Sequence, residues 1–327
     1  MAQHAFKMGY AISSEEHLPN DIVRHARRAE EIGFTFSLIS DHFHPWTDEQ
    51  GQSPFVWTVL GAIAHNTTHL QIGTGVTCPT IRTHPAIIAH AAATVAAMMP
   101  GRFFLGVGTG ENLNEHIFGD RWPAYSVRQE MLEEAIHIIR LLWQGDLKTH
   151  HGKHYTVENA RIYTLPDTPP PIMVAASGDE SGRMAGELGD GLISTAPNPE
   201  VVKVFEQHGS KSRPRYGKVT VCWAQTEEEA RRTAHRVWPT AALQGGLSQE
   251  LPLPRHFEAA ARTVSEDDIA EYIVCGNDPD AYLAKIHEFA DAGYDHIYLH
   301  QVGPDQEGFF RFYQKQLQPA LSEHVRA

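Results

Sequence analysis

Short apolar segments of the β type recur along the whole chain, and segments with the pattern of an amphipathic helix separate them. Each β-type segment is a continuous apolar run, which is typical of parallel strands buried on both faces. The segments are Met8–Ser13, Phe36–Ser40, Leu70–Thr77, Phe103–Gly108, Ile172–Ala176, Gly191–Thr195, Val219–Ala224 and His296–His300. Eight strands that alternate with helices predict an α/β fold of the (β/α)8 TIM-barrel type.

The segments between the strands carry helix signals of their own. Arg128–Trp143 places its apolar residues at helical spacing on one face. A second helix is expected from about Asp21, after Pro19-Asn20, to Ile32. Two more are expected from Pro85 to Met99 and from Pro279 to Ala292. A doubly wound open sheet is the alternative, but no strong dinucleotide-binding fingerprint supports it.

The chain has 327 residues, more than the ~250 typical of such a barrel, so insertions are expected. One covers about residues 145–170 and has the pattern of a small β-hairpin followed by a proline-rich stretch. The other covers residues 239–268, where Gly245-Gly246, Pro252 and Pro254 interrupt the alternation. We expect both insertions at the carboxyl-terminal face of the barrel. Because no internal repeat or linker is visible, residues 1–327 are expected to form one domain.

Composition narrows the possible partners. A net charge of −13 argues against nucleic acid and anionic membranes. Cys78, Cys222 and Cys275 are too few and too widely spaced for a disulfide framework or a cysteine zinc site, and they suggest a reducing compartment. The apolar run Ala89–Met99 is too short to span a bilayer, and the first residues lack the pattern of a secretion signal. We therefore expect a cytoplasmic protein that acts on a small molecule.

The segment 37–46 is the part of the chain most typical of a functional site. Its apolar strand stops abruptly at Asp41-His42-Phe43-His44-Pro45-Trp46. Imidazoles titrate near neutral pH, a carboxylate can fix or charge a neighbour, and an indole offers a flat stacking face. Side chains just past the strand ends of a barrel share one mouth. We therefore expect an active site here, with a purely structural loop as the alternative.

Other strand ends should supply the rest of this mouth. They are Gly73–Thr77, Gly108–Glu115, Ser177-Gly178 and His300-Gln301. In the glycine-rich run that ends at Gly110, the third glycine comes one residue too early for the fingerprint G-x-G-x-x-G. These glycines indicate either a tight turn or the close approach of a planar cofactor to the backbone.

Two further patterns, at Glu111 and at the His42/His44 pair, could indicate a catalytic acid and a metal site. Glu111 lies among apolar and glycine neighbours, where a carboxyl group beside a cofactor can donate a proton; its alternative role is to interact with free amides at a helix start. His42 and His44 form an H-x-H pair, but a metal site needs more ligands. Ser177 and Thr195 at the fifth and sixth strand ends supply none, so we expect no metal.

The motifs together resemble those of the luciferase-like flavin and deazaflavin oxidoreductases, most closely the coenzyme F420-dependent group related to glucose-6-phosphate dehydrogenase. The resemblance runs through nearly the whole chain in order. It is carried by Ser40–Trp46, Gly73–Thr80, Arg82–Pro85, Pro100–Glu115, Trp143, Ala175–Gly178 and Gly293–His296. It implies an enzyme that transfers a hydride between coenzyme F420 and a substrate, with the deazaflavin in the barrel mouth and usually a homodimer.

The resemblance also implies roles for single residues. His42 would be the base that takes the proton of the substrate hydroxyl, Trp46 would stabilise the developing state, and Glu111 would act as an acid toward a ring nitrogen. His44 becomes a structural residue. The implied cofactor-binding residues are Asp41, Gly75, Val76, Thr77, Thr109, Gly110, Asn114, Ser177 and Gly178. Related members have a non-proline cis peptide on the third strand, which would be the Gly75–Val76 bond here.

The chain departs from the sugar-phosphate enzymes of this group where they hold the substrate phosphate. Thr195–Pro199 follows the sixth strand, where those enzymes have a lysine, Ala241–Glu250 has no Lys or Arg, and Glu271-Tyr272 replaces an expected arginine. Because phosphate needs fixed cations, we expect a less charged alcohol, or a reducible carbonyl or enone, rather than glucose 6-phosphate. Arg183 or a helix start would have to offset the negative net charge near an anionic cofactor tail.

Three other functions remain open at this point. An FMN-dependent monooxygenase of the wider luciferase-like class would share the fold and use FMN in place of F420. A metal-dependent barrel hydrolase would use His42 and His44. A cofactor carrier would bind the deazaflavin without turnover.

Overall fold

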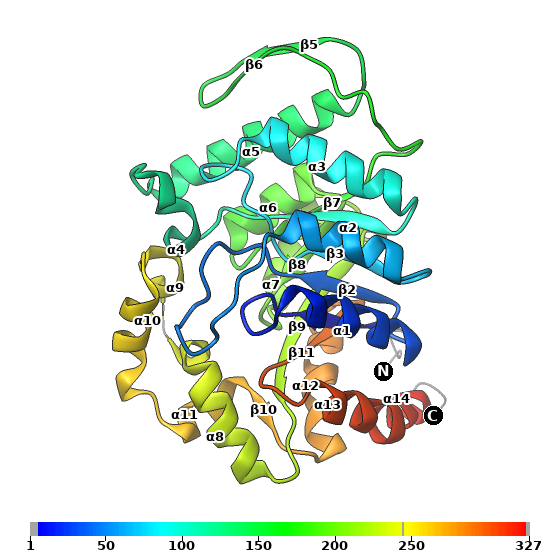
Figure 1. Ribbon diagram of the computed structural model, residues 1–327, viewed down its shortest axis with the longest axis vertical. Helices are drawn as coiled ribbons and strands as arrows, with labels where there is room; N and C mark the ends of the chain where they lie inside the picture. The colour runs from blue at the N-terminus through cyan, green and yellow to red at the C-terminus, as the bar shows by residue number, and fades with distance from the viewer. Residues whose placement is uncertain (1–5, 244, 325–327) are drawn as a thin grey trace.

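The computed structural model describes residues 6–243 and 245–324. Eight parallel strands pair in the order β1-β2-β3-β4-β7-β8-β9-β11, and β11 pairs with β1, so the sheet closes into a barrel (Figure 1). The strands are β1 Lys7–Ile12, β2 Phe36–Ile39, β3 Gln71–Thr74, β4 Phe103–Val107, β7 Ile172–Ala175, β8 Gly191–Ser194, β9 Arg215–Cys222 and β11 His296–Gln301. The predicted TIM barrel is confirmed, and each predicted strand overlaps one of these eight.

Helices surround the barrel (Figure 1). They are α1 Pro19–Glu31, α2 Val56–Asn66, α3 Pro85–Met98, α4 Asn112–Glu115, α5 Tyr125–Leu142, α6 Asp179–Leu188, α7 Pro199–His208, α8 Glu227–Val237, α12 Pro279–Asp291, α13 Gln306–Phe312 and α14 Gln318–His324. The four helices expected from the sequence are α1, α3, α5 and α12. Proline occupies the first position of α1, α3, α7 and α12, where its missing N–H has no intrahelical partner to lose. No described helix is long and apolar enough to cross a bilayer.

Aromatic side chains fill the barrel below its mouth. Phe104 stacks on Tyr216 at 5.1 Å between ring centroids, and Phe36 meets the edge of Tyr216 at 5.2 Å. These rings come from the first two residues of β2, β4 and β9, at the amino-terminal end of the barrel. The barrel is therefore packed at that end, and space for a ligand remains only toward the carboxyl ends of the strands, as is usual for this fold.

The first insertion contains the predicted hairpin, formed by β5 (Lys148–His151) and β6 (Thr156–Ala160). It follows helix α5 rather than a strand, so it leaves from the end of the barrel opposite the mouth. The hairpin then folds along the outside of α5 (Figure 1), where the Glu134 carboxylate accepts hydrogen bonds from the N–H groups of Lys153, His154 and Tyr155. The hairpin was expected at the mouth of the barrel, but only its turn lies near that end. There the Tyr155 hydroxyl donates a hydrogen bond to the carbonyl of Thr80, which follows β3.

The second insertion covers the mouth, as predicted. After α8 it forms short helices, η2 Pro239–Ala242, α9 Leu247–Glu250, α10 Pro254–Ala260, η3 Ala261–Thr263 and α11 Glu266–Tyr272, and then strand β10 Val274–Cys275, which pairs with β9. Phe257 of α10 packs edge-on against Trp46 at 5.2 Å. The Gln50 amide donates to the carbonyl of Val237. The loop after β2 is thus held between the barrel and this insertion.

Candidate active site

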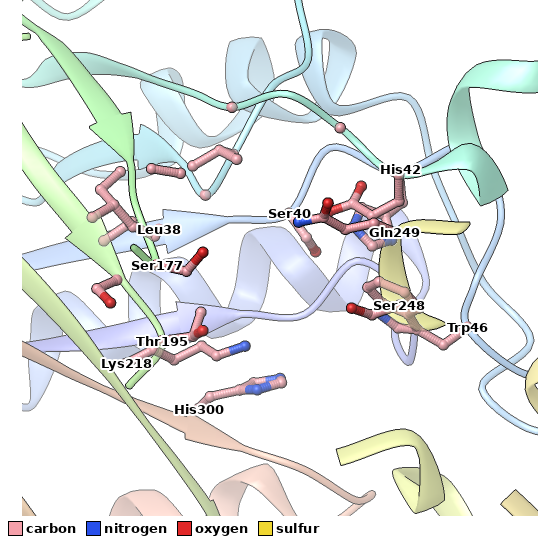
Figure 2. A pocket seen from close by; sticks show the side chains of 18 of the residues that line it. Leu38, Ser40, His42, Trp46, Ser177, Thr195, Lys218, Ser248, Gln249 and His300 are labelled. Atoms are coloured by element: carbon pink, nitrogen blue, oxygen red, sulfur yellow. The ribbon is translucent and has the colours of Figure 1, made fainter. Parts of the chain in front are cut away.

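A cavity of about 540 Å³ lies at the carboxyl ends of the strands, within the range of roughly 300–1,000 Å³ that small-molecule sites occupy. Residues of β1, β2, β9 and β11 line one part of it, and the segments after β3, β4 and β7 line another. The second insertion contributes residues such as Thr240 and Gln249. Figure 2 shows side chains from these elements converging on one space.

His42 lies in this cavity beside a carboxylate that sequence reasoning had overlooked. Its Nδ1 is 3.2 Å from Oε1 of Glu15, which comes from the segment after β1. The other oxygen of Glu15 accepts hydrogen bonds from the hydroxyls of Ser13 and Ser40. Both His42 and Glu15 are buried, and Trp46 meets the imidazole ring at 5.1 Å between centroids. Nδ1 itself makes no hydrogen bond within the described residues, so the Glu15 carboxylate acts on the imidazole as a close negative charge, and Nε2 is left for a ligand.

Asp41 and Thr77 stand behind the cavity wall rather than in it. Asp41 accepts a hydrogen bond from the Thr77 hydroxyl at 2.8 Å and another from the guanidinium of Arg82 at 2.9 Å. Arg82 also lies 3.5 Å from the carboxylate of Glu115. Burial raises the pKa of Glu115 to about 7 although Arg82 opposes the shift. This cluster of opposite charges ties the loops after β2, β3 and β4 together.

Asn114 likewise positions the His42 loop from behind. Its side-chain oxygen accepts the backbone N–H groups of Phe43 at 2.8 Å and His44 at 3.1 Å. The Nδ1 atom of His44 is 2.9 Å from the carbonyl of Leu113. Among the described residues, no group of three or more His, Cys, Asp or Glu side chains is arranged to hold a metal ion.

Small residues form a smooth part of the wall. Gly75 and Val76 line it, and the bond between them is a cis peptide, as the family resemblance predicts. Thr109 and Gly110 follow from the segment after β4. Gly110 has φ +75°, and a Cβ there would lie 2.5 Å from Sγ of Cys78. Gly110 is therefore needed for a tight turn. The segment also presents a surface without large side chains to the cavity.

Glu111 and Ser177 line the cavity on the same wall. Glu111 is the N-cap residue of α4, and one of its carboxylate oxygens is 3.4 Å from the Asn114 amide nitrogen. Gly178 precedes helix α6 and faces open space, although it does not line the cavity. Arg183, which was expected to offset the negative charge near an anionic cofactor tail, is paired with Glu187. The amino-terminal end of α6 supplies a positive pole here, although Asp179 and Glu180 lie in its first turn.

Sequence reasoning missed two charged residues of the cavity, Glu15 and Lys218. Glu15 follows the first predicted strand, so its signal is that of an acid at a strand end. Lys218 lies within β9, whose predicted start at Val219 excluded it. The sequence signal for Lys218 was its spacing of two residues from Tyr216, which places both side chains on the same, inward face of the strand. Trp238 and Gln249 carried no signal, because one lies just before an irregular insertion and the other lies within it.

The family model described as luciferase-like monooxygenase matches residues 4–296 of the chain. The chain belongs to this family. Among curated relatives, the F420-dependent glucose-6-phosphate dehydrogenase of Mycolicibacterium gilvum (strain PYR-GCK) is 34% identical, over 96% of this chain and 98% of the relative. The enzyme of the same description from Microbacterium testaceum (strain StLB037) is 35% identical, over 96% and 97%.

Solved structures of the luciferase-like fold agree with the sequence comparison. An F420-dependent secondary alcohol dehydrogenase in complex with an F420-acetone adduct superposes with a TM-score of 0.88, at 30% identity over 95% of this chain and 98% of that one. The coenzyme F420-dependent tetrahydromethanopterin reductase of Methanopyrus kandleri has a TM-score of 0.79 at 21% identity. The second likeness concerns the fold alone.

Proposed function

We propose that this protein is a coenzyme F420-dependent oxidoreductase that transfers a hydride between F420 and a small alcohol or carbonyl compound. One observation carries the proposal: the Glu15–His42 pair lies in the same cavity as a wall of small residues, formed by Gly75, Val76 and Gly110. An alcohol oxidation needs a proton acceptor and a hydride acceptor at the two sides of one carbon. The similarity to F420-dependent dehydrogenases supports the same assignment.

The small-residue wall suits a flat ring system, since no large side chain projects from it. Gly75, Val76, Thr109 and Gly110 would contact the ring, and Ser177 with Gly178 would lie toward an anionic tail at the start of α6. Asp41, Thr77 and Asn114 would support these contacts from behind through the bonds described above. When bound, the deazaflavin supplies a carbon that accepts or returns a hydride.

The protein's own residues handle the proton. Oxidation breaks the carbinol C–H bond, whose electron pair leaves with the hydrogen as hydride, while the hydroxyl proton passes to Nε2 of His42 and a C=O bond forms. The Glu15 carboxylate, 3.2 Å from Nδ1, stabilises the imidazolium that results. Trp46 forms the wall of the site beside the imidazole ring, and Glu111 lines the same cavity, where it would act as an acid toward the cofactor.

The lining does not favour glucose 6-phosphate as the substrate. Thr195, Ala241 and Ser248 occupy the wall where a sugar-phosphate enzyme needs cations. Lys218 is the one Lys or Arg among the described lining residues. A phosphate dianion binds well only where several fixed donors or cations converge, so a smaller, less charged substrate fits this cavity better.

Cofactor choice is tested by titrating the apo-protein with F420 and with FMN while following the cofactor's absorbance or fluorescence. The proposal expects tighter binding of F420, and tighter FMN binding would favour a luciferase-like monooxygenase. A screen of cofactor reduction with secondary alcohols, sugars and glucose 6-phosphate, and of reoxidation with ketones and enones, then finds the substrate class. Binding of F420 without turnover of any compound would identify a carrier.

A further inference from the structure

Lys218 is directed into the barrel just below the mouth. It lies in β9, where its neighbour across the strand pair is Tyr298 of β11, and both side chains line the cavity. On the other side the pairing of Ser194 with Gly217 brings Thr195 next to Lys218. Figure 2 shows the Lys218 ammonium group reaching into the cavity between Thr195 and His300. A cation thus lies inside the site, and Thr195 and His300 are its neighbours in the cavity wall.

The Lys218 ammonium group has no direct partner among the described residues. No hydrogen bond and no ion pair within 4.0 Å involves it, and only the carboxylates of Glu15 and Glu111 act on it through space. Glu15 is already committed to His42 and two serine hydroxyls. Burial lowers the pKa of Lys218, and the two carboxylates oppose that shift. Without a partner in the described part of the chain, this ammonium group is available to bind an anionic ligand in the cavity.

Neutral polar groups accompany this cation. His300 is buried, its ring packs edge-on against Trp238 at 4.8 Å, and its Nδ1 has no hydrogen-bond partner. Burial lowers the pKa of His300 well below its usual value, and the charge of Lys218 adds to the effect, so the imidazole is neutral at physiological pH. Thr195 adds a hydroxyl to the same wall. One positive charge flanked by uncharged donors matches a monoanion.

We propose that Lys218 determines substrate specificity by binding a single carboxylate carried on the alcohol, so that the substrates are small hydroxy acids and the matching oxo acids. This inference rests on the proposed function and specifies its substrate class. Carboxylate is favoured over phosphate because the cavity offers one cation and because the nearby Glu15 and Glu111 repel a dianion more strongly. His42 would act on the hydroxyl while Lys218 holds the far end.

Paired substrates test the assignment. Reduction of F420 is measured with 3-hydroxybutyrate and with its uncharged analogue 2-butanol, using wild type, Lys218→Met and the exposed control Lys203→Met of α7. For Lys218→Met we expect kcat/KM for the hydroxy acid to fall about 100-fold, mainly through KM, because a buried carboxylate loses its charge partner. With 2-butanol, the rate of Lys218→Met should stay within about threefold of the wild-type rate, because the neutral alcohol has no carboxylate for Lys218 to bind. Equal losses for both substrates, or no loss, would overturn the proposal.

A binding measurement separates this inference from the proposed function. Calorimetry follows acetoacetate and inorganic phosphate binding to the cofactor-free protein, with thermal unfolding as a folding check. The inference expects acetoacetate to bind the wild type more tightly than phosphate does, and Lys218→Met to lose that binding. Tighter phosphate binding, or equal acetoacetate binding by both proteins, contradicts it. If the protein binds acetoacetate through Lys218 but neither binds nor turns over F420, the proposed function fails by itself.

Discussion

At the scale of the residue, the site depends on a few charged side chains held by fixed partners. Asp41, Thr77 and Asn114 were predicted to contact the cofactor, whereas the structure places them behind the cavity wall, bonded to Arg82 and the His42 loop. The sequence could show that these residues cluster at strand ends. It could not show which member of each cluster faces inward, because that depends on loop conformation rather than on strand register.

His42 is the first residue to test. His42→Ala should lower the rate of F420 reduction by an alcohol about 10²–10⁴-fold, the range typical of a lost general base. F420 affinity should hardly change, because His42 belongs to the substrate side of the proposed site. Stopped-flow kinetics and cofactor titration measure the two quantities. His65→Ala, an exposed histidine on α2, is the control, and a native rate for His42→Ala would remove the residue from the mechanism.

Glu15→Gln tests the positioning role of the carboxylate. The variant keeps the shape of the side chain but removes the charge that lies 3.2 Å from Nδ1 of His42. We expect kcat to fall on the order of 10–100-fold, because the imidazolium loses its counter-charge. KM for a neutral alcohol should change little. Steady-state kinetics over a pH range check this, and an unchanged kcat at every pH would assign Glu15 a structural role only.

Arg82 tests the charge cluster behind the wall. Arg82→Met leaves the buried carboxylates of Asp41 and Glu115 without their cation, so the free energy of unfolding should fall by about 3–5 kcal/mol. Denaturant unfolding measures this change. The exposed Arg27 of α1, paired with Glu31, is the control, and Arg27→Met should cost less than about 1 kcal/mol. Similar stabilities for the two variants would show that the cluster does not hold the loops.

At the scale of the element, the sequence pattern located every barrel strand because buried parallel strands are continuous apolar runs. The pattern failed where that condition fails. The first four residues of β9 include Arg215 and Lys218, and β10 has only two residues. The hairpin was predicted, but its position outside α5 was not, because a hairpin carries no signal for the surface on which it packs.

The contact between β3 and β4 gives a prediction about packing. A Cβ at Gly106 would lie 1.9 Å from the carbonyl oxygen of Thr74, so Gly106→Ala must push the two strands apart. We expect a loss of roughly 1–3 kcal/mol or more, as for other overpacked cores. In contrast, Gly61 lies in helix α2, and its Cβ would come no closer than 3.8 Å to Met98.

Thermal and denaturant unfolding of both glycine variants measure the difference. Gly61→Ala should stabilise the protein by roughly 0.5–1 kcal/mol, since alanine is the better helix former. Gly106→Ala with wild-type stability would mean that β3 and β4 are not in the close contact described here.

At the scale of the whole molecule, the barrel closes through charges at its amino-terminal end. Asp295, just before β11, accepts hydrogen bonds from the backbone and guanidinium of Arg215 at the start of β9, and its carbonyl accepts from the N–H of Lys7 in β1. Burial alone would raise the pKa of Asp295, but the bonds from His296 and Arg215 outweigh it and hold the pKa below the usual 3.8. Three strands thus meet at Asp295, because its carboxylate bonds Arg215 of β9 and its backbone carbonyl bonds Lys7 of β1.

The sign of the pH effect follows from that lowered pKa. Asp295 stabilises the folded chain above its unfolded pKa, and this contribution is lost as the pH falls below about 4. At neutral pH, Asp295→Asn should therefore cost about 2–3 kcal/mol of unfolding free energy, and the gap to wild type should narrow as the pH falls toward 3. Urea unfolding at several pH values measures this. A gap that stays constant would mean that charge at Asp295 does not contribute to closure.

Hydride transfer between an alcohol and F420 in this cavity underlies every catalytic role proposed for these residues. The most direct measurement is a single-turnover reaction of the protein–F420 complex with an alcohol that carries deuterium on its carbinol carbon, followed by mass spectrometry of the reduced cofactor. The account predicts one deuterium on the reduced cofactor, one equivalent of the carbonyl product and a slower rate than with the unlabelled alcohol. Reduced cofactor that carries only hydrogen from solvent, or no reduction by any alcohol while F420 is bound, would contradict it.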